Sequence, residues 1–461
     1  MHAEAGRAAA EAEFEADLER LKGLLRIPSI SALPEYSGQT AQAAQYLAQE
    51  LRRIGMTEST VIATNGHPVV RAERQDLPGG PWVTFYGHYD VQPPDPLNLW
   101  ISAPFDPVVR NGSVYARGAS DDKGQLWAVI CGVAAVIRAQ GRLPVNVRFL
   151  VEGEEESAGK SLAVYLSDHR HELHSDVVFI ADGEFVAVGM PALHTGLRGM
   201  LYLEITVFGA DRDLHSGIYG GIAPNPLNSL AWILSGLKDE NGHVRVDGFY
   251  EQVRQPADEE LRRWAELPLE PSLEADIGVV SLEGELGYST LERRWSRPTM
   301  DVHGIWGGFS GHGSKTVIPS QASAKFSFRL VPDQDPHVIL ESLRRRITEL
   351  LSPGVRFELE VIDAVPPASF AIDTLAARAA EVALERGFGD RPGIVRTGGS
   401  IPVAPLLQQF TGGQMVVTGF GLPDDNLHSP NEKLGLDQFR GGVASTIEFL
   451  FAIAAGGVKA D

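Results

Sequence analysis

Histidine and aspartate side chains come directly after two short apolar segments of this chain. Residues 82–86 form a β-favouring run that is followed at once by His88 and Asp90, and the similar run 176–181 is followed by Asp182. On an extended backbone, residues two apart point their side chains to the same side, which is a useful geometry for metal ligands. A capped turn with a hydrogen-bonded histidine would give the same pattern, so this motif alone decides nothing.

Two clusters of acidic residues lie where predicted elements begin or end. Asp121 and Asp122 are adjacent at the point where a loop turns into a predicted helix, and helix capping explains one acid more easily than two. Four of the five residues 152–156 are acidic, directly after the apolar run 145–151. Neighbouring carboxylates repel one another unless cations, amide groups or solvent compensate them. A metal site and a solvated loop both remain open at this point.

His428, after a late strand predicted at 414–420, adds a second imidazole to this collection. Two imidazoles and several carboxylates, each from a loop that follows a separate element, suit two divalent ions sharing one carboxylate. Such a centre lowers the pKa of a water, polarises a carbonyl oxygen, and needs one further carboxylate to move the proton. The combination therefore predicts a metal-dependent hydrolase.

The elements that would position these residues predict an α/β sheet followed by a different kind of domain. The strands 82–86, 145–151 and 176–181, with a helix over 122–139, favour an open sheet whose ligands bind outside the carboxyl ends of its strands. From about residue 196 the hydrophobic pattern alternates, which is typical of a sheet with one solvent-facing side.

The second pattern predicts a βαββαβ order, and residues beyond about 365 are expected to complete the first sheet. The segment 239–298 has no clean period. The expected domains are 1–195 and 365–461 together, with 196–364 inserted between them. The predicted elements of the inserted domain are strand 201–208, helix 226–238, strand 299–305, strand 322–330, helix 335–351 and strand 355–362.

Composition excludes several classes of partner. A formal net charge of -20 without any Lys/Arg-rich run argues against nucleic acid and against anionic membrane surfaces. The single cysteine, Cys131, cannot form an internal disulfide, and its apolar neighbours predict core packing. Residues 1–25 have helical spacing and lack the apolar core of a signal peptide, and no stretch approaches the ~20 apolar residues of a membrane span. A cytoplasmic protein is expected.

Six motifs in order carry a resemblance to the M20 metallopeptidases, in particular to the cytosolic nonspecific dipeptidase and carnosine dipeptidase branch. They span nearly the whole chain and are Gly-His-Tyr-Asp-Val-Gln-Pro at 87–93, Arg-Gly-Ala-Ser-Asp-Asp-Lys-Gly at 117–124, Glu-Glu-Ser at 155–157, Asp-Leu-His-Ser-Gly at 213–217, Lys-Thr-Val-Ile-Pro at 315–319 and Gly-Gly-Ser-Ile-Pro at 398–402. The resemblance implies a zinc-peptidase-like α/β catalytic domain, with a central mixed sheet and helices on both faces, and an inserted ferredoxin-like lid and dimerisation domain.

The resemblance also implies a role for each matching residue of the metal site. His88 and Asp182 would hold one ion, Glu156 and His428 the other, and Asp121 would bridge them. Glu155 would be the general base, and Asp90 would orient His88. The triplet 154–156 leaves the register ambiguous where the family has a pair, and Ser157 resolves it. Zn²⁺ is the first choice of metal, with Mn²⁺ or Co²⁺ as alternatives.

Further residues match substrate contacts and the subunit interface of the family. His215 would reach the active site of a neighbouring subunit in a homodimer formed by the inserted domain, and would stabilise the oxyanion there. Arg329 would grip the carboxylate of a small peptide substrate, with Thr316 and Ser400 as further contacts. The segment 96–100 departs from the glycine and acidic residues usual in the branch. The alternatives are an N-acyl amino-acid deacylase on the same metal core, and a noncatalytic binding scaffold.

Overall fold

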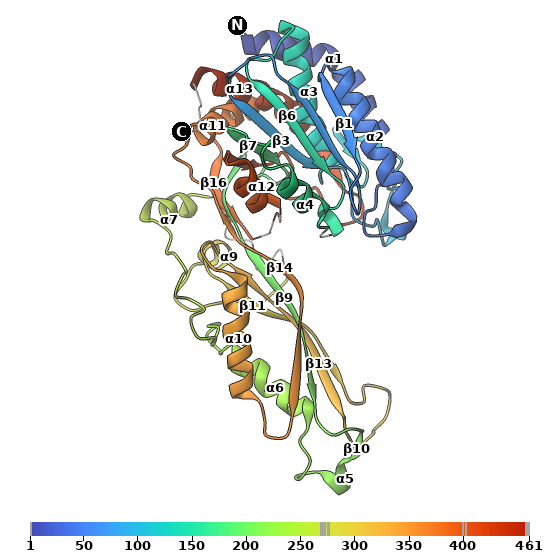
Figure 1. The fold of residues 1–461 in the computed structure, drawn as a ribbon, viewed down its shortest axis with the longest axis vertical. Helices are drawn as coiled ribbons and strands as arrows, with labels where there is room; N and C mark the ends of the chain where they lie inside the picture. The colour runs from blue at the N-terminus through green and yellow to red at the C-terminus, as the bar shows by residue number, and fades with distance from the viewer. Residues whose placement is uncertain are drawn as a thin grey trace.

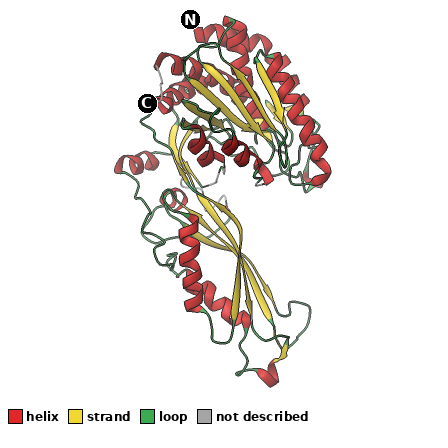
Figure 2. Cartoon of the chain, viewed as in Figure 1, coloured by secondary structure: helices red, strands yellow, loops and turns green. Residues whose placement is uncertain are grey.

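The computed structural model describes residues 2–157, 159–267, 273, 277–398, 401 and 403–456. In this part of the chain, two lobes follow one another along the long axis of the molecule (Figure 1). The large lobe contains a nine-stranded mixed sheet, and the small lobe contains a four-stranded antiparallel sheet (Figure 2). This architecture confirms the predicted mixed α/β fold.

The large sheet has four parallel strands at its centre. β6, β3, β7 and β17 lie side by side in this order and are parallel to one another. The predicted strands correspond to these with small differences at their ends, whereas β1, β2, β8, β15 and β16 lie outside the predicted elements. The strands of this sheet are β1 (Glu58–Ile62), β2 (Val69–Arg74), β3 (Trp82–His88), β6 (Asn146–Glu152), β7 (Val177–Ala181), β8 (Ala192–Leu197), β15 (Ala368–Ser369), β16 (Gly393–Thr397) and β17 (Gln414–Thr418).

Side chains along the central strands alternate between two hydrophobic cores, one on each face of the sheet. In β3, Val83 and Phe85 belong to one core and Tyr86 to the other. Successive side chains of a strand point to opposite faces, so strands covered on both faces are apolar throughout. The first face is covered by α1 (His2–Leu25), α2 (Ser37–Arg53), α3 (Lys123–Gln140), α11 (Leu375–Phe388) and α13 (Leu436–Gly456), and the second by α4 (Ser161–Asp168) and α12 (Val403–Thr411).

The small lobe has the predicted βαββαβ order. Its sheet runs β11-β13-β9-β14, so β11 and β14 are its edges. The inward residues of β9, such as Leu201 and Leu203, share a core with α6 and α10, and the alternate residues lie on an open face. The elements are β9 (Gly199–Phe208), α6 (Pro226–Leu237), β11 (Thr299–Gly307), β13 (Gln321–Leu330), α10 (Pro336–Leu350) and β14 (Arg356–Val365).

Short elements complete the two lobes. The segment without a clean period contains α7 (Asp258–Ala265) and α9 (Thr290–Trp295), and Trp264 and Trp295 pack there against Val395 of β16. At the far tip of the small lobe lie β10 (Leu214–His215), α5 (Ser216–Tyr219) and β12 (Val317–Ile318) (Figure 1). A small sheet in the large lobe consists of β4 (Val108–Arg110), β5 (Ser113–Tyr115) and β18 (Lys433–Gly435).

Helix α13 departs from the expectation that no segment is long and apolar enough for a membrane span. It meets that criterion by length and composition, with a mean hydropathy of 1.2 over its most apolar window. However, 61% of that window is buried inside the protein, where α13 packs against α3 and α11. Burial in a core explains its apolar character without a membrane.

Candidate metal centre

The carboxyl ends of the four parallel strands place the predicted site residues at one edge of the large sheet. His88 is the last residue of β3, Asp182 follows β7, and the short 3-10 helix 155–157 follows β6. His428 is in the loop after β17, and Asp121 is in the loop before α3. Because the carboxyl ends of parallel strands meet at the same edge, residues more than 300 positions apart in the sequence become neighbours.

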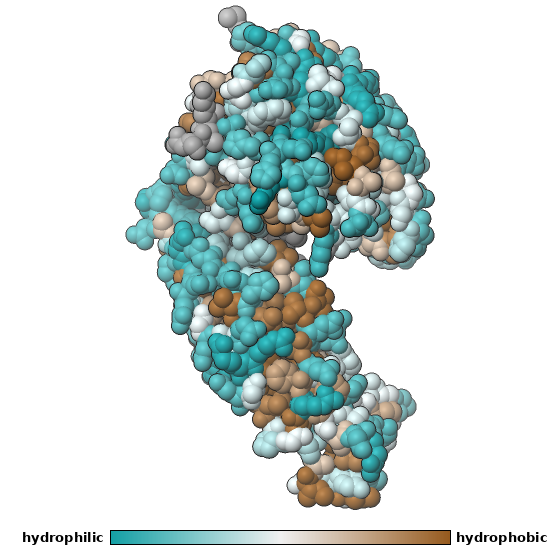
Figure 3. Space-filling view, in the orientation of Figure 1, coloured by the Kyte–Doolittle hydropathy of each residue, from teal (hydrophilic) through white to brown (hydrophobic). Residues whose placement is uncertain are grey.

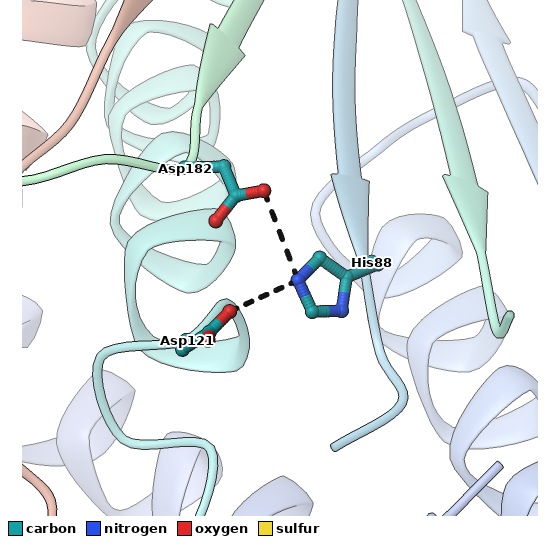
Figure 4. A group of neighbouring side chains, drawn as sticks. All are labelled: His88, Asp121 and Asp182. Carbon is teal, nitrogen blue, oxygen red and sulfur yellow. Dashed lines mark hydrogen bonds and ion pairs between the residues drawn. The ribbon is translucent and has the colours of Figure 1, made fainter. Parts of the chain in front are cut away.

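The first group of potential ligands is His88, Asp121 and Asp182 (Figure 4). His88 Nε2 lies 3.2 Å from Asp121 Oδ1 and 3.8 Å from Asp182 Oδ2. The side chains of the two aspartates and the ring of His88 point toward a common centre from three different segments (Figure 4). One nitrogen and two oxygens converging in this way suit a divalent cation.

The second group is Asp121, Glu156 and His428. His428 Nε2 lies 2.9 Å from Asp121 Oδ2 and 3.4 Å from Glu156 Oε2. Within each group the potential ligand atoms all lie within 4.8 Å of one another. Asp121 belongs to both groups, with Oδ1 toward His88 and Oδ2 toward His428. It is therefore placed to join two cation positions.

Hydrogen bonding leaves His88 Nε2 free to act as a ligand. His88 Nδ1 donates to the backbone carbonyl of Asp90 over 3.1 Å and lies 3.3 Å from the Asp90 carboxylate. A proton held on Nδ1 leaves the lone pair of Nε2 directed at the two aspartates. Asp90 is itself held by Ser31, whose hydroxyl donates to Oδ2 over 2.6 Å.

The electrostatics of the site fit a bound cation. Burial raises the pKa of Asp182 to about 7, and the nearby Asp121 and Glu156 carboxylates add to this effect against the opposing influence of His88. Burial also raises the pKa of Asp121, but hydrogen bonds from His428 and His88 outweigh it and hold that pKa well below its usual range. Buried carboxylates this close together need compensating positive charge, which imidazolium groups or divalent cations supply. The mixture of imidazole nitrogen and carboxylate oxygen suits Zn²⁺ and also Mn²⁺.

The three consecutive glutamates 154–156 have different surroundings. Glu154 accepts hydrogen bonds from the backbone amides of His67, over 3.0 Å, and Ser161, over 3.1 Å. Glu156 faces His428, and Glu155 lines the same cavity as the potential ligands without belonging to either group. Burial raises the pKa of Glu155 well above its usual range, and the surrounding carboxylates raise it further. The nearby His88 lowers this pKa but does not outweigh them. Glu154 thus joins two loops, and Glu155 is the carboxylate beside the ligands.

Sequence reasoning missed the residues that hold the Asp121 loop. The buried Glu432 accepts hydrogen bonds from the backbone amides of Ser120 and Asp121, over 2.9 and 3.1 Å, and from Arg117 Nη1 over 2.7 Å. Asp425 accepts from the Ser120 hydroxyl over 3.0 Å. Both acids lie in the segment that carries His428, so this network fixes the two halves of the site relative to each other. The sequence signal for this network is that the acids Asp425 and Glu432 flank His428.

The side chain of Asp122 has a different role from helix capping. Asp122 occupies the position before α3, but its side chain makes no capping hydrogen bond. Its Oδ2 instead accepts from the backbone amide of His88 over 3.1 Å. The second acid of the pair therefore supports the first ligand.

A cavity of about 800 Å³ opens beside the candidate metal centre. Its walls include Glu155, Asp182 and His428 from the large lobe, and Arg294 and Trp295 of α9. Glu184 also lines it, and burial together with Asp425 and Asp121 raises its pKa to about 7. The segment without a clean period thus forms one wall of this cavity.

The predicted substrate residues lie away from the potential metal ligands. His215 and Thr316 are neighbours at the tip of the small lobe, where the pairing of β10 with β12 sets His215 opposite Val317. His215 and Thr316 are both exposed. Neither lines the cavity, and Figure 1 shows β10 at the end of the molecule farthest from the large lobe. Arg329 lies on the open face of β13 and is also outside the cavity wall. Ser400 lies outside the described residues.

Comparison with known proteins identifies relatives over most of the chain. Residues 84–452 match the model of peptidase family M20/M25/M40. The chain is 31% identical to the Beta-Ala-His dipeptidase of Rattus norvegicus, covering 88% of this chain and 86% of that protein. It is also 31% identical to a Cys-Gly metallodipeptidase of Schizosaccharomyces pombe, covering 95% of both chains.

Comparison of the fold finds a solved structure that is similar over most of this chain. An M20 family metallo-carboxypeptidase from Sulfolobus solfataricus superposes with a TM-score of 0.83 at 30% sequence identity, covering 95% of this chain and 99% of that one. Together with the family match, this similarity shows that the chain belongs to peptidase family M20/M25/M40 and is an enzyme of the metallopeptidase type.

Proposed function

We propose that this enzyme hydrolyses the amide bond of dipeptides or short peptides with a free C-terminal carboxylate, using two divalent metal ions. His88 and Asp182 would hold one ion, Glu156 and His428 the other, and Asp121 would bridge them. The observation that carries this proposal is that the two oxygens of Asp121 lie 3.2 and 2.9 Å from two different histidines. Zn²⁺ is the first choice for both ions, with Mn²⁺ and Co²⁺ as alternatives.

Two bound cations would polarise the substrate carbonyl and lower the pKa of a water molecule. The chain's own residues then move the protons. Glu155 takes a proton from the attacking water and delivers it to the leaving amine. A carboxyl group with a raised pKa suits this double task, because it must both accept and release a proton near neutral pH. Asp90 keeps His88 in the orientation that directs Nε2 into the site.

The similarity to dipeptidases supports peptides rather than N-acyl amino acids as substrates. Two relatives that cover most of this chain are named for the dipeptides β-Ala-His and Cys-Gly. A guanidinium fork binds a carboxylate through two parallel hydrogen bonds, so Arg329 is proposed to hold the C-terminal carboxylate. Thr316 and Ser400 are proposed as further substrate contacts.

The same proposal divides the chain into three segments. Residues 1–195 and 365–461 form the catalytic domain, and residues 196–364 act as lid and dimerisation domain. Strand β11 is an edge of the small sheet, and its Ile305 and Trp306 are 58% and 44% exposed. An exposed edge strand with apolar side chains favours pairing with a second chain. Figure 3 shows apolar surface gathered on this lobe.

A homodimer gives the distant His215 a role. It lies too far along the small lobe to line the cavity of its own chain, so it is proposed to enter the site of the partner subunit and stabilise the oxyanion there. For location we propose the cytoplasm, since the one cysteine is a buried free thiol and the fold needs no oxidising compartment.

The test replaces Glu155 by Gln and compares two substrate panels. The variant is expected to bind as much metal as the wild type and to lose turnover by at least about 10²-fold, since it retains the shape but not the proton transfer. Wild-type enzyme is expected to cleave dipeptides faster than N-acyl amino acids. Full activity of the variant would contradict the role of Glu155, and faster cleavage of the N-acyl panel would favour a deacylase.

A further inference from the structure

Three arginine side chains gather where the cavity meets the open face of the small sheet. Arg198 Nε donates to the backbone carbonyl of Gly398 over 3.1 Å, and Gly398 lines the cavity. A Cβ atom on Gly398 would lie 3.2 Å from Arg198 Nη2 and 3.7 Å from the backbone oxygen of Arg294. The Arg198 guanidinium is therefore beside α9 at the cavity rim, and Arg294 itself forms part of the cavity wall.

Strand register brings Arg329 to the same place. Arg329 of β13 pairs directly with Met200 of β9. Arg198 immediately precedes β9, whose first residue Gly199 pairs with Leu330, so its backbone lies next to the end of β13 that carries Arg329. Burial lowers the pKa of Arg198 to about 10, and the positive charges of Arg329 and Arg294 add to this shift while the Asp301 carboxylate opposes it. The three guanidinium groups thus influence one another.

None of the three guanidinium groups has a carboxylate within ion-pair distance among the residues described for this chain. Elsewhere in the protein, buried arginines are paired, as Arg117 is with Glu432 over 2.7 Å. Glu184 lines the same cavity as Arg294 and Asp301 lies near Arg198, but neither carboxylate forms an ion pair with these guanidinium groups within the described residues. Guanidinium groups that gather without forming an ion pair can each still bind an anionic ligand directly.

We propose that Arg198 and Arg294 extend the carboxylate site of Arg329 into a site for two carboxylates, so that the enzyme prefers peptides whose C-terminal residue is Asp or Glu. This inference rests on the proposed function, because Arg329 is taken to hold the α-carboxylate. The side-chain carboxylate of the same residue is attached to the same α-carbon, only a few bonds away. One guanidinium group satisfies the first carboxylate, and the other two are available for the second.

The test compares Ala-Glu with its uncharged isostere Ala-Gln. The wild-type enzyme is expected to show a kcat/KM for Ala-Glu about tenfold or more above that for Ala-Gln, the ratio expected for a charge-assisted hydrogen bond. In Arg294→Gln this ratio should fall toward one. Arg293→Gln is the matched control, because it removes the same charge from the same helix while its side chain points away, toward the Glu285 carbonyl at 2.9 Å.

A binding measurement separates this inference from the proposed function. Calorimetric titration with L-glutamate and L-glutamine needs no turnover. Tighter binding of glutamate than of glutamine, lost in Arg294→Gln and kept in Arg293→Gln, supports the two-carboxylate site. If neither dipeptide is hydrolysed while this binding pattern holds, only the proposed function is overturned. Equal binding of both amino acids, or equal kcat/KM for both dipeptides in the wild type, overturns the inference and leaves dipeptide hydrolysis standing.

Discussion

The backbone amide of Glu156 donates a hydrogen bond to Asp90 Oδ2 over 3.0 Å. The same aspartate holds His88 Nδ1 through its backbone carbonyl and lies beside that nitrogen with its other carboxylate oxygen. One buried residue therefore positions a potential ligand of each group. Asp90 couples the loop after β3 to the loop after β6.

Replacing Asp90 by Asn is expected to weaken metal binding by about 10- to 100-fold, the usual effect of losing a partner that orients a ligand. Asn keeps only one side-chain oxygen, so its NH₂ group must face either the Nδ1–H of His88 or the backbone amide of Glu156, and the ligand that faces the NH₂ group loses part of its support. Competition with a chelator measures the affinity. Asp211→Asn, an exposed site with its side chain 84% accessible, is the control and should bind metal as the wild type does. Unchanged affinity in Asp90→Asn would remove Asp90 from the positioning role.

Glu154 and Glu155 are expected to differ sharply when each is replaced by Gln. Glu154 accepts two backbone amides and faces no ligand, so Glu154→Gln should lower the free energy of unfolding by about 1–3 kcal/mol and leave turnover nearly intact. Urea denaturation gives the first quantity and steady-state kinetics the second. If Glu154→Gln lost turnover while Glu155→Gln kept it, the register of the triplet would be wrong.

The convergence of the site could be predicted because four of the five potential ligands, all except Asp121, follow an apolar strand, and parallel strands end at the same edge. His88 and Asp182 illustrate this, and their atoms now lie 3.8 Å apart. Glu432 could not be predicted, because its partners are backbone amides more than 300 residues away, and a backbone amide leaves no mark in a sequence. The pattern of residues 239–298 failed for a related reason. Its helices are short, and α9 is stabilised by packing of Trp295 against the large lobe rather than by its own period.

Glu432→Gln is expected to destabilise the protein by about 3–5 kcal/mol, because it leaves Arg117 buried without its counter-charge. Urea unfolding, followed by tryptophan fluorescence, measures this loss. Glu358→Gln is the control. Its ion pair with Arg356 is exposed on both sides, 70% and 66%, so its loss should cost at most about 1 kcal/mol. Equal effects in the two variants would show that the Glu432 network does not hold the Asp121 loop.

His215→Ala is expected to reduce kcat by about 10²- to 10³-fold if the imidazole stabilises the oxyanion. Co-expression with Glu155→Gln chains tests whether it acts on the partner subunit. A mixed dimer then contains one site with both an intact Glu155 and an intact His215, so random pairing should restore about a quarter of the wild-type activity. Activity that stays at the level of the two single variants would place His215 in its own subunit's site or outside catalysis.

The number of metal ions per chain tests most directly whether Asp121 is shared by two ions. It is measured on protein that is stripped with chelator, re-equilibrated with Zn²⁺ and freed of unbound ions. The wild type is expected to bind two ions per chain. Asp121→Ala is expected to lose affinity for both ions and to lose dipeptide hydrolysis, because Oδ1 and Oδ2 of Asp121 face different histidines. One ion per chain with full activity, or full activity in the stripped protein, would contradict the account.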